Sequence, residues 1–465
     1  MMKIDWKAEV VKRKEDLLKE TQGLLQIRSV LDEEHNAAEA PFGEGIAEAL
    51  NYMMKLGHSA EMTVKNVEGY AAHLEMGQGE ELVGILGHLD VVPEGDGWSV
   101  DPFGGEIKDG KLYARGAIDD KGPTMAAFYA MKIVQELKLP LSKRVRLILG
   151  TDEESQWRCV KRYFESEEMP SIGFAPDADF PIIHAEKGML NVEWTGRPNV
   201  ASLTGDYVLQ SFHSGRRLNM VPDVAEAVIS GDAALCKAFD AYLAQHQAAG
   251  SSEVKGERIH LTLQGKSAHG STPEFGINAG VMLAQFLSTQ ALDEAGKQYV
   301  TFVATYVQET QGVALGIASE DEVSGPLTVN AGVFSYEHGK STIGLNVRYP
   351  VQHDGDQVLA KMQQLASDHA FDISIIKHTR PHFIDENHTL VQTLRKVYEE
   401  QTGLSGKPIA IGGGTYARSL KAGVAFGALF PGREDVAHQK DEYMFVEDLI
   451  NACAIYAEAI YELAR

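Results

Sequence analysis

The chain has 465 residues, of which 44% are apolar and 8% aromatic, and its formal net charge at pH 7 is −23. A chain of this length exceeds the size at which one hydrophobic core keeps growing, so we expect at least two domains. The acidic balance repels nucleic-acid phosphates and anionic membrane surfaces, and therefore disfavours both as partners.

The three cysteines are Cys159, Cys236 and Cys453, an odd number at wide spacing. They predict neither a disulfide framework nor a CxxC thiolate metal site, which favours a reducing compartment. The first residues contain no apolar run of signal-peptide length, and nowhere do 18 consecutive apolar residues occur. We therefore expect a soluble, cytoplasmic protein without a membrane span.

The first part of the chain alternates between helical and strand patterns. Leucines at helical spacing predict helical structure within Ile4–Val30, and a second helix is expected over Phe42–Leu56. Short apolar runs predict buried strands at Leu82–Leu86 and Val145–Leu149, with a helix over Thr124–Leu137 between them. This alternation is typical of an α/β domain with a mostly parallel sheet, in which ligands bind beyond the carboxyl ends of the strands.

After Gly188 one order of elements occurs twice: a strand, a turn that contains aspartate, a helix and a strand. The pattern predicts an inserted α+β domain of two similar halves over residues 189–380, whereas residues 1–188 and 381–465 form the first domain. The segments of the two halves are Val221–Ser230, Ala233–Gln245 and Arg258–Leu263, then Thr342–Tyr349, Asp356–His369 and Phe371–Ile376. A helix over Thr389–Gln401 and a glycine-rich turn at Gly412–Gly414 mark the return to the first domain.

Acidic residues and a histidine follow the predicted strands. His88 and Asp90 project to the same side of a strand, and a metal-bound imidazole often donates its second N–H to a carboxylate such as Asp90. Asp119 precedes a helix, where a capping turn is the simplest interpretation, but a carboxylate can also bridge two metals about 3.5–4 Å apart. The run Asp152-Glu153-Glu154 is either a solvated acidic loop or a group that requires nearby cations.

The ordered set of motifs is more specific than any one of them. It resembles the aminoacylase and carboxypeptidase family of di-zinc metallopeptidases, with a zinc-peptidase-like catalytic domain and an inserted lid domain. The matching segments are Gly87-His88-Leu89-Asp90-Val91-Val92-Pro93, Arg115 to Gly122, Asp152-Glu153-Glu154, Asp177 and His438. Gly97 to Gly105 and Gly412 to Arg418 extend the match to bacterial dipeptidases of the PepV type, and the resemblance covers nearly the whole chain.

The resemblance implies a pair of divalent cations. His88 and Asp177 would hold one, Glu154 and His438 the other, and Asp119 would bridge them; Asp179, two residues after Asp177, remains an alternative ligand. It also implies a cis peptide bond between Asp119 and Asp120. Two histidines and three carboxylates without a thiolate suit zinc, with manganese or cobalt as alternatives.

The implied reaction is hydrolysis of the peptide bond of dipeptides by a hydroxide that bridges the metals, with Glu153 as general base. Deacylation of N-acyl amino acids, as in desuccinylases and deacetylases of the same family, is an alternative that uses the same chemistry. An inactive metal-binding module is a second alternative, although it would be expected to lack Glu153.

The insertion resembles the family's lid. His269 would donate to the oxyanion, Arg348 would bind the substrate carboxylate, and Asn219 is a further polar candidate. Gly413 and Thr415 belong to a run whose backbone N–H groups could bind an anion, although an ordinary helix-entry turn is equally compatible. Because the second half of the insertion would replace a partner's lid, we expect a monomer that acts on small peptides.

Overall fold

The computed structural model describes residues 4–197 and 205–465. The chain divides into two compact units: the first holds Met1–His184, Phe383–Ile409 and Gly414–Arg465, and the second holds Ala185–His382 and Ala410–Gly413. The sequence predicted the divisions after residue 188 and before residue 381, and it did not predict the short return to the second unit. Residues 1–3 and 198–204, within the predicted domains, lie outside the described residues.

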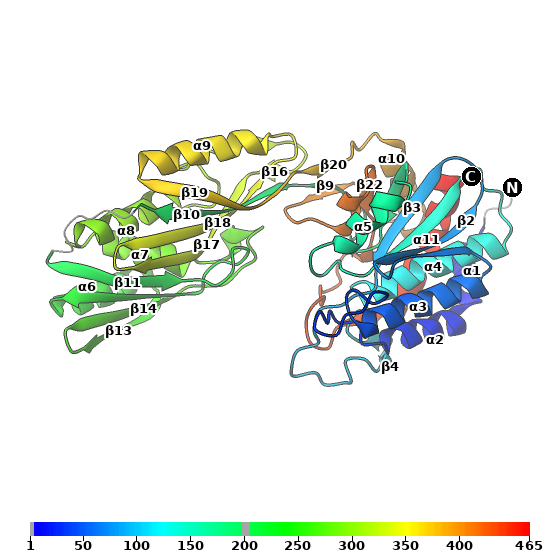
Figure 1. Cartoon of the computed structure of the whole chain (residues 1–465), viewed down its shortest axis with the longest axis horizontal. Helices are drawn as coiled ribbons and strands as arrows, with labels where there is room; N and C mark the ends of the chain where they lie inside the picture. The colour runs from blue at the N-terminus through cyan, green and yellow to red at the C-terminus, as the bar shows by residue number, and fades with distance from the viewer. Residues whose placement is uncertain (1–3, 198–204) are drawn as a thin grey trace. The chain divides into compact units, whose positions relative to one another are not determined.

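The first unit combines seven described α-helices with a central sheet (Figure 1). Its helices are α1 (Trp6–Val11), α2 (Lys14–Leu25), α3 (Glu44–Ser59), α4 (Lys121–Glu136), α5 (Arg158–Ser166), α10 (Thr389–Thr402) and α11 (Val446–Ala464), and Tyr416–Ser419 form the 3₁₀ turn η2. Its strands are β1 (Thr63–Val67), β2 (Ala71–Gly77), β3 (Leu82–His88), β4 (Glu106–Lys108), β5 (Lys111–Tyr113), β6 (Arg144–Gly150), β7 (Ile172–Ala175), β8 (Ala178–Asp179), β22 (Gly423–Ala425), β23 (Ala428–Leu429) and β24 (Tyr443–Phe445).

The central sheet has the strand order β1-β2-β6-β3-β7-β22 and continues through β9 (Ile183–Glu186) and β20 (His382–Phe383), with β21 (Ile409–Ile411) paired to β9. Strands β6, β3, β7 and β22 are parallel to one another. Strand β2 is antiparallel to both of its neighbours, β1 and β6, and β9 is antiparallel to β22. The sheet is therefore mixed, and its four central strands have the predicted parallel arrangement.

Two almost fully buried helices stabilise this sheet. Helix α4 is buried around almost its whole circumference, as expected of a helix inside a large core, and it packs against α11 and β3. Their buried side chains form one hydrophobic cluster with strands β2, β3 and β6. The cluster fixes the start of α4, where Asp119 and Asp120 lie, relative to the carboxyl ends of the central strands.

The second unit contains an eight-stranded antiparallel sheet of order β13-β14-β12-β11-β17-β18-β10-β19. Its strands are β10 (Gly188–Gly196), β11 (Tyr207–Ser214), β12 (Val224–Gly231), β13 (Ala249–Lys255), β14 (Arg258–Gln264), β17 (Thr328–Glu337), β18 (Lys340–Tyr349) and β19 (Phe371–Thr379), with a separate hairpin of β15 (Glu320–Asp321) and β16 (Gly325–Pro326). Its helices are α6 (Ala234–His246), α7 (Ala279–Ser288), α8 (Glu294–Tyr306) and α9 (Gly355–Asp368), with the 3₁₀ turn η1 (Pro273–Phe275). All four α-helices contribute to one hydrophobic cluster with the sheet.

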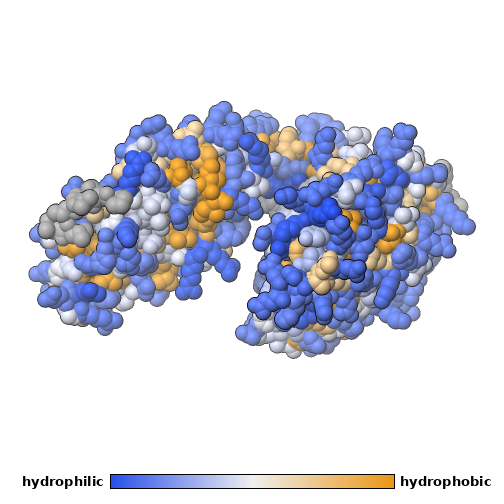
Figure 2. Space-filling view, viewed as in Figure 1, coloured by the Kyte–Doolittle hydropathy of each residue, from blue (hydrophilic) through white to orange (hydrophobic). Residues whose placement is uncertain are grey.

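Both predicted halves of the insertion occur in this unit. The first is β12-α6-β14 with the additional strand β13, and the second is β18-α9-β19. The face visible in Figure 2 is mostly hydrophilic, as the net charge of −23 suggests. No helix within the described ranges is long and apolar enough to cross a bilayer.

Candidate metal centre

Three neighbouring parallel strands deliver acidic and histidine side chains to one edge of the central sheet. Strand β3 ends at His88, β6 ends at Gly150 just before Glu153 and Glu154, and β7 ends at Ala175 just before Asp177. Because β3 lies between β6 and β7, these side chains come together at the carboxyl ends of the strands, where α/β sheets bind ligands.

The start of helix α4 lies close to the end of β3. A side chain at Gly87 would overlap the Thr124 hydroxyl, since an added Cβ would lie 2.1 Å from its Oγ1. The Asp120 carboxylate accepts hydrogen bonds from the His88 backbone N–H at 3.1 Å and from the Thr124 hydroxyl at 2.9 Å. The peptide bond between Asp119 and Asp120 is cis. Glycine at position 87 thus permits the close approach that brings Asp119 to the strand ends.

The Asp119 carboxylate lies between two histidines. Its Oδ1 is 3.0 Å from His88 Nε2, and its Oδ2 is 3.0 Å from His438 Nε2. His438 Nε2 is also 2.9 Å from Glu154 Oε1, and His88 Nε2 is 3.7 Å from Asp177 Oδ2. The five residues that the sequence suggested as metal ligands therefore form one continuous group, with Asp177 on the side of His88 and Glu154 on the side of His438.

The alternative ligand Asp179 lies away from this group. It is exposed and belongs to β8, which pairs with β23. Because β8 begins at Ala178, Asp177 lies outside the strand. Two-residue spacing therefore does not place the side chains of Asp177 and Asp179 on the same side.

The role expected for Asp90 differs in the structure. His88 Nδ1 donates to the backbone carbonyl of Asp90 at 2.9 Å, whereas the Asp90 carboxylate is 3.5 Å away. That carboxylate accepts instead from the backbone N–H groups of Glu153 at 3.1 Å and of Glu154 at 3.0 Å. Asp90 therefore holds the acidic loop after β6, and a carbonyl two residues after His88 orients its ring.

The orientation of His88 suits a cation. A carbonyl oxygen only accepts, so Nδ1 must carry the hydrogen, and a neutral ring then presents the lone pair of Nε2 to Asp119 and Asp177. A divalent cation bound there would accept electron pairs from the imidazole and from both carboxylates, and would offset the repulsion between them.

The acidic groups also require positive charge. Burial raises the pKa of Glu153 well above its usual range, and neighbouring carboxylates raise it further. Burial and the adjacent Asp119 raise the pKa of Asp177 to about 7. Buried Asp120 Oδ1 has no hydrogen-bond partner among the described residues. The donor set, the lone-pair direction and this orphaned oxygen fit divalent cations, and both His88-Asp119-Glu154 and His88-Asp120-Asp177 have the spacing of metal ligands.

Glu153 differs from its two acidic neighbours. Asp152 is neutralised by Arg158, whose guanidinium donates to it at 2.7 Å, and Glu154 contacts His438. Within the described part of the chain no group donates a hydrogen bond to the Glu153 carboxylate. It is thus the acid of this loop whose oxygens are available to accept a proton.

The predicted residues of the second unit gather around Arg348. This residue lies on β18 and is only 5% exposed, so it is a buried cation rather than a surface charge. Its guanidinium donates to Asn346 Oδ1 at 2.9 Å and to the Gly412 carbonyl at 2.5 Å, next to Gly413. Arg348 and burial both lower the pKa of His269, with burial the larger cause.

His269 and Asn219 lie on exposed, adjoining backbone of the second unit. The His269 ring contacts the Ser271 hydroxyl at 2.6 Å, and Gly270 N–H donates to the Asn219 carbonyl at 2.7 Å. Thr415 lies in the first unit at the start of η2 and is largely buried. Gly412 and Gly413 belong to the second unit, so the predicted glycine-rich run is divided between the two units.

No role at this site was predicted for Glu442, or for Arg115 although a matching segment begins there. Both are buried and form an ion pair of 2.5 Å beside Asp119. Glu442 lies in the run Gln439-Lys440-Asp441-Glu442, whose polarity indicates a solvated loop, so no local signal distinguishes it.

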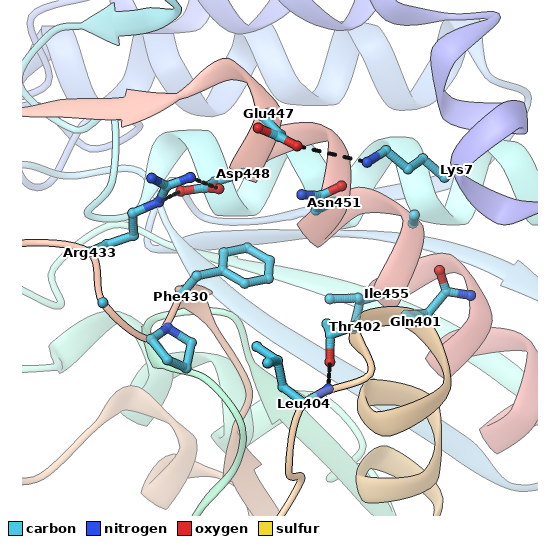
Figure 3. A pocket seen from close by; sticks show the side chains of 13 residues that line it. Lys7, Gln401, Thr402, Leu404, Phe430, Arg433, Glu447, Asp448, Asn451 and Ile455 are labelled. Carbon is cyan, nitrogen blue, oxygen red and sulfur yellow. Dashed lines mark hydrogen bonds and ion pairs between the residues drawn. The ribbon is translucent and has the colours of Figure 1, made fainter.

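A separate cavity of about 400 Å³ lies in the first unit between α10 and the start of α11 (Figure 3). Its charged groups are already paired: Arg433 donates to Asp448 at 2.7 and 2.8 Å, and Lys7 lies 4.0 Å from Glu447. It contains none of the predicted site residues, so the cluster around Asp119 remains the candidate site.

Comparison with known proteins identifies the family of the chain. Residues 84–462 match the model of peptidase family M20/M25/M40, a range that includes every residue of the cluster. The chain belongs to this family. It is therefore a hydrolase that acts on peptide bonds.

A Bacillus subtilis relative named "Putative dipeptidase YtjP" is 51% identical, over 99% of this chain and 100% of the relative. Among solved structures, the aminoacylhistidine dipeptidase of Vibrio alginolyticus superposes with a TM-score of 0.59 at 13% identity, over 97% of this chain and 96% of that one. Aminopeptidase PepT of Bacillus cereus superposes with a TM-score of 0.57 at 16% identity, over 97% of this chain and 99% of that one. At these identities the two structures establish the shared fold.

Proposed function

We propose that the chain is a dipeptidase that binds two divalent cations, zinc being preferred, at the cluster around Asp119. The observation that carries the proposal is the Asp119 carboxylate, with one oxygen 3.0 Å from His88 and the other 3.0 Å from His438. One carboxylate shared between two histidines is the arrangement expected of a bridging ligand in a two-metal hydrolase.

The ligands divide into two groups. His88, Asp177 and one oxygen of Asp119 would hold the first cation, and Glu154, His438 and the other oxygen would hold the second. When bound, the cations supply positive charge that polarises the scissile carbonyl and makes water a stronger acid. All five groups bind only in their deprotonated forms, so affinity for the cations falls in acid.

Glu153 is the general base in this proposal. Its carboxylate takes a proton from the attacking water and delivers that proton to the leaving amine nitrogen. Asp90 fixes the base by accepting the backbone N–H groups of Glu153 and Glu154 at 3.1 and 3.0 Å. A base held by its own backbone can move a proton with little rearrangement of the loop.

The second unit would recognise the substrate. We assign His269 as a donor to the oxyanion that forms during hydrolysis, and Arg348 as the partner of the substrate carboxylate. Asn219, Gly413 and Thr415 are assigned as further substrate-binding groups. The guanidinium of Arg348 is oriented by Asn346 and by the Gly412 carbonyl, which limits the entropy lost when it binds a carboxylate.

Dipeptides are the proposed substrates because a relative that is 51% identical over its full length carries the name of a dipeptidase. The two related halves of the second unit support action as a monomer, which light scattering of the purified protein would test. A dimer whose formation depends on the second unit would contradict this part of the proposal.

The decisive experiment measures bound metal and hydrolysis together. Purified protein should contain two equivalents of divalent cation, hydrolyse dipeptides, and lose activity with a chelator in proportion to the metal removed. A panel of dipeptides, tripeptides and N-acyl amino acids defines the substrate. Faster turnover of N-acetyl or N-succinyl amino acids than of dipeptides with a free amine would favour the deacylase alternative and contradict the proposal.

A further inference from the structure

A buried ion pair joins the two segments that carry Asp119 and His438. Arg115 lies four residues before Asp119, and Glu442 lies four residues after His438. Both side chains are almost completely excluded from solvent, and Arg115 Nη1 donates to Glu442 Oε2 at 2.5 Å. The guanidinium also lies 5.3 Å from the centre of the Trp98 ring. The pair is thus enclosed on several sides rather than solvated.

Strand pairing explains why these distant segments meet. Strand β24 pairs antiparallel with β5, so that Tyr443 lies opposite Tyr113. The backbone continues this pairing, because Ala114 N–H donates to the Glu442 carbonyl at 3.1 Å. The loop that runs from β5 to Asp119 and the loop that runs from His438 to β24 therefore lie side by side where they join these strands.

The other oxygen of Glu442 holds the backbone of the bridging residue. Oε1 accepts from the N–H of Ile118 at 3.0 Å and from the N–H of Asp119 at 3.3 Å. With Arg115 on Oε2, three donors occupy the carboxylate, so Glu442 is not itself a metal ligand. Its hydrogen bonds fix the backbone from which Asp119 projects, while its own backbone belongs to the segment of His438.

We propose that Glu442, oriented by Arg115, is a positioning residue that fixes Asp119 relative to His438 and thereby sets the affinity for the second cation. This inference rests on the two-cation function proposed above. The cation held by His88 and Asp177 depends less on the pair, because those ligands come from the ends of β3 and β7.

The test separates positioning from stability by exchanging the pair for apolar side chains. In R115M/E442M both charges are lost together, and such replacement of a buried ion pair is often neutral or stabilising. The two backbone N–H groups, however, lose their acceptor. We expect thermal unfolding close to that of the native protein, and an affinity for the second zinc equivalent, measured by titration against a chelating dye, reduced about 10–100-fold.

R115M/E442Q is the conservative variant, since the glutamine oxygen again accepts from Ile118 and Asp119. It should recover most of the lost affinity although its net charge equals that of R115M/E442M. In an H438A background, which lacks a ligand of the second cation, R115M/E442M should lower the affinity of the remaining zinc by much less than it lowers the affinity for the second equivalent when His438 is present. The matched control is R146M/E75M, which removes a largely buried ion pair of 2.6 Å elsewhere in the first unit and should not change either affinity.

Native affinity for both zinc equivalents in R115M/E442M would overturn the inference, as would equal affinities in the two double variants. If neither double variant folds, the pair determines folding rather than positioning, which also overturns it. A different result would contradict the proposed function itself: the native protein would bind no pair of cations or would hydrolyse no dipeptide.

Discussion

Replacing Glu153 by glutamine tests the proposed chemistry most directly. The amide has nearly the shape of the carboxylate but cannot take a proton from water. The exchange breaks no hydrogen bond to the side chain among the described residues, and the backbone N–H groups of Glu153 and Glu154 can still donate to Asp90. Folding and cation binding should therefore be unchanged.

The expected loss is in turnover alone. General-base catalysis contributes about 10²–10⁴-fold, which corresponds to roughly 3–5 kcal/mol of activation free energy. E153Q should thus lower kcat for a dipeptide by at least about 100-fold while two equivalents of metal remain bound and KM changes little. The adjacent residue provides the matched comparison: Glu154 contacts His438 at 2.9 Å, so E154Q should lose metal as well as activity.

The assay combines initial rates of dipeptide hydrolysis with elemental analysis of the same protein sample. Turnover of E153Q within tenfold of the native rate would show that another group accepts the proton. Loss of metal from E153Q would show that Glu153 is a ligand. Either result refutes the assigned role of Glu153.

The remaining predictions concern the ligands, the second unit and acid stability. D177N should lose about one equivalent of metal by elemental analysis, whereas D179N should retain two. H269A should lower kcat about 100-fold or more without loss of metal, as removal of an oxyanion donor does; unchanged kcat would exclude that role. Burial and Arg146 lower the pKa of His73 to about 4. The pKa of a histidine in the unfolded chain is about 6.5, so between about pH 6.5 and pH 4 the unfolded chain binds more protons than the folded chain. The stability of the fold therefore decreases as the pH falls through this window. In urea unfolding from pH 6.5 to 4.5, H73Q should lose about 2 kcal/mol less stability than the native protein.

Local patterns were sufficient for the elements that bring the cluster together. The apolar runs Leu82–Leu86 and Val145–Leu149 occur as β3 and β6, and the helix expected over Thr124–Leu137 occurs as α4. Such strands are recognised because both of their faces are buried. The helical stretch Ile4–Val30 is divided into α1 and α2 between Val11 and Lys14, a break that spacing alone does not reveal.

Roles that depend on long-range contacts were not predictable in the same way. The H-x-D spacing is compatible with a hydrogen bond from His88 to the Asp90 carboxylate, but the nearer backbone carbonyl accepts it. Burial of Arg348 and Glu442 depends on partners 64 and 327 residues away, Gly412 and Arg115. The placement of Ala410–Gly413 in the second unit likewise depends on contacts that no local pattern encodes.

The order in which the chain is synthesised has a consequence for metal loading. The proposed ligands extend from His88 to His438, and β22, which completes the parallel centre beside β7, ends only at Ala425. A ribosome must therefore release nearly all of the polypeptide before the binding site exists. The proposed site would therefore be complete only once the segment of His438 has joined the strand ends that carry His88 and Asp177.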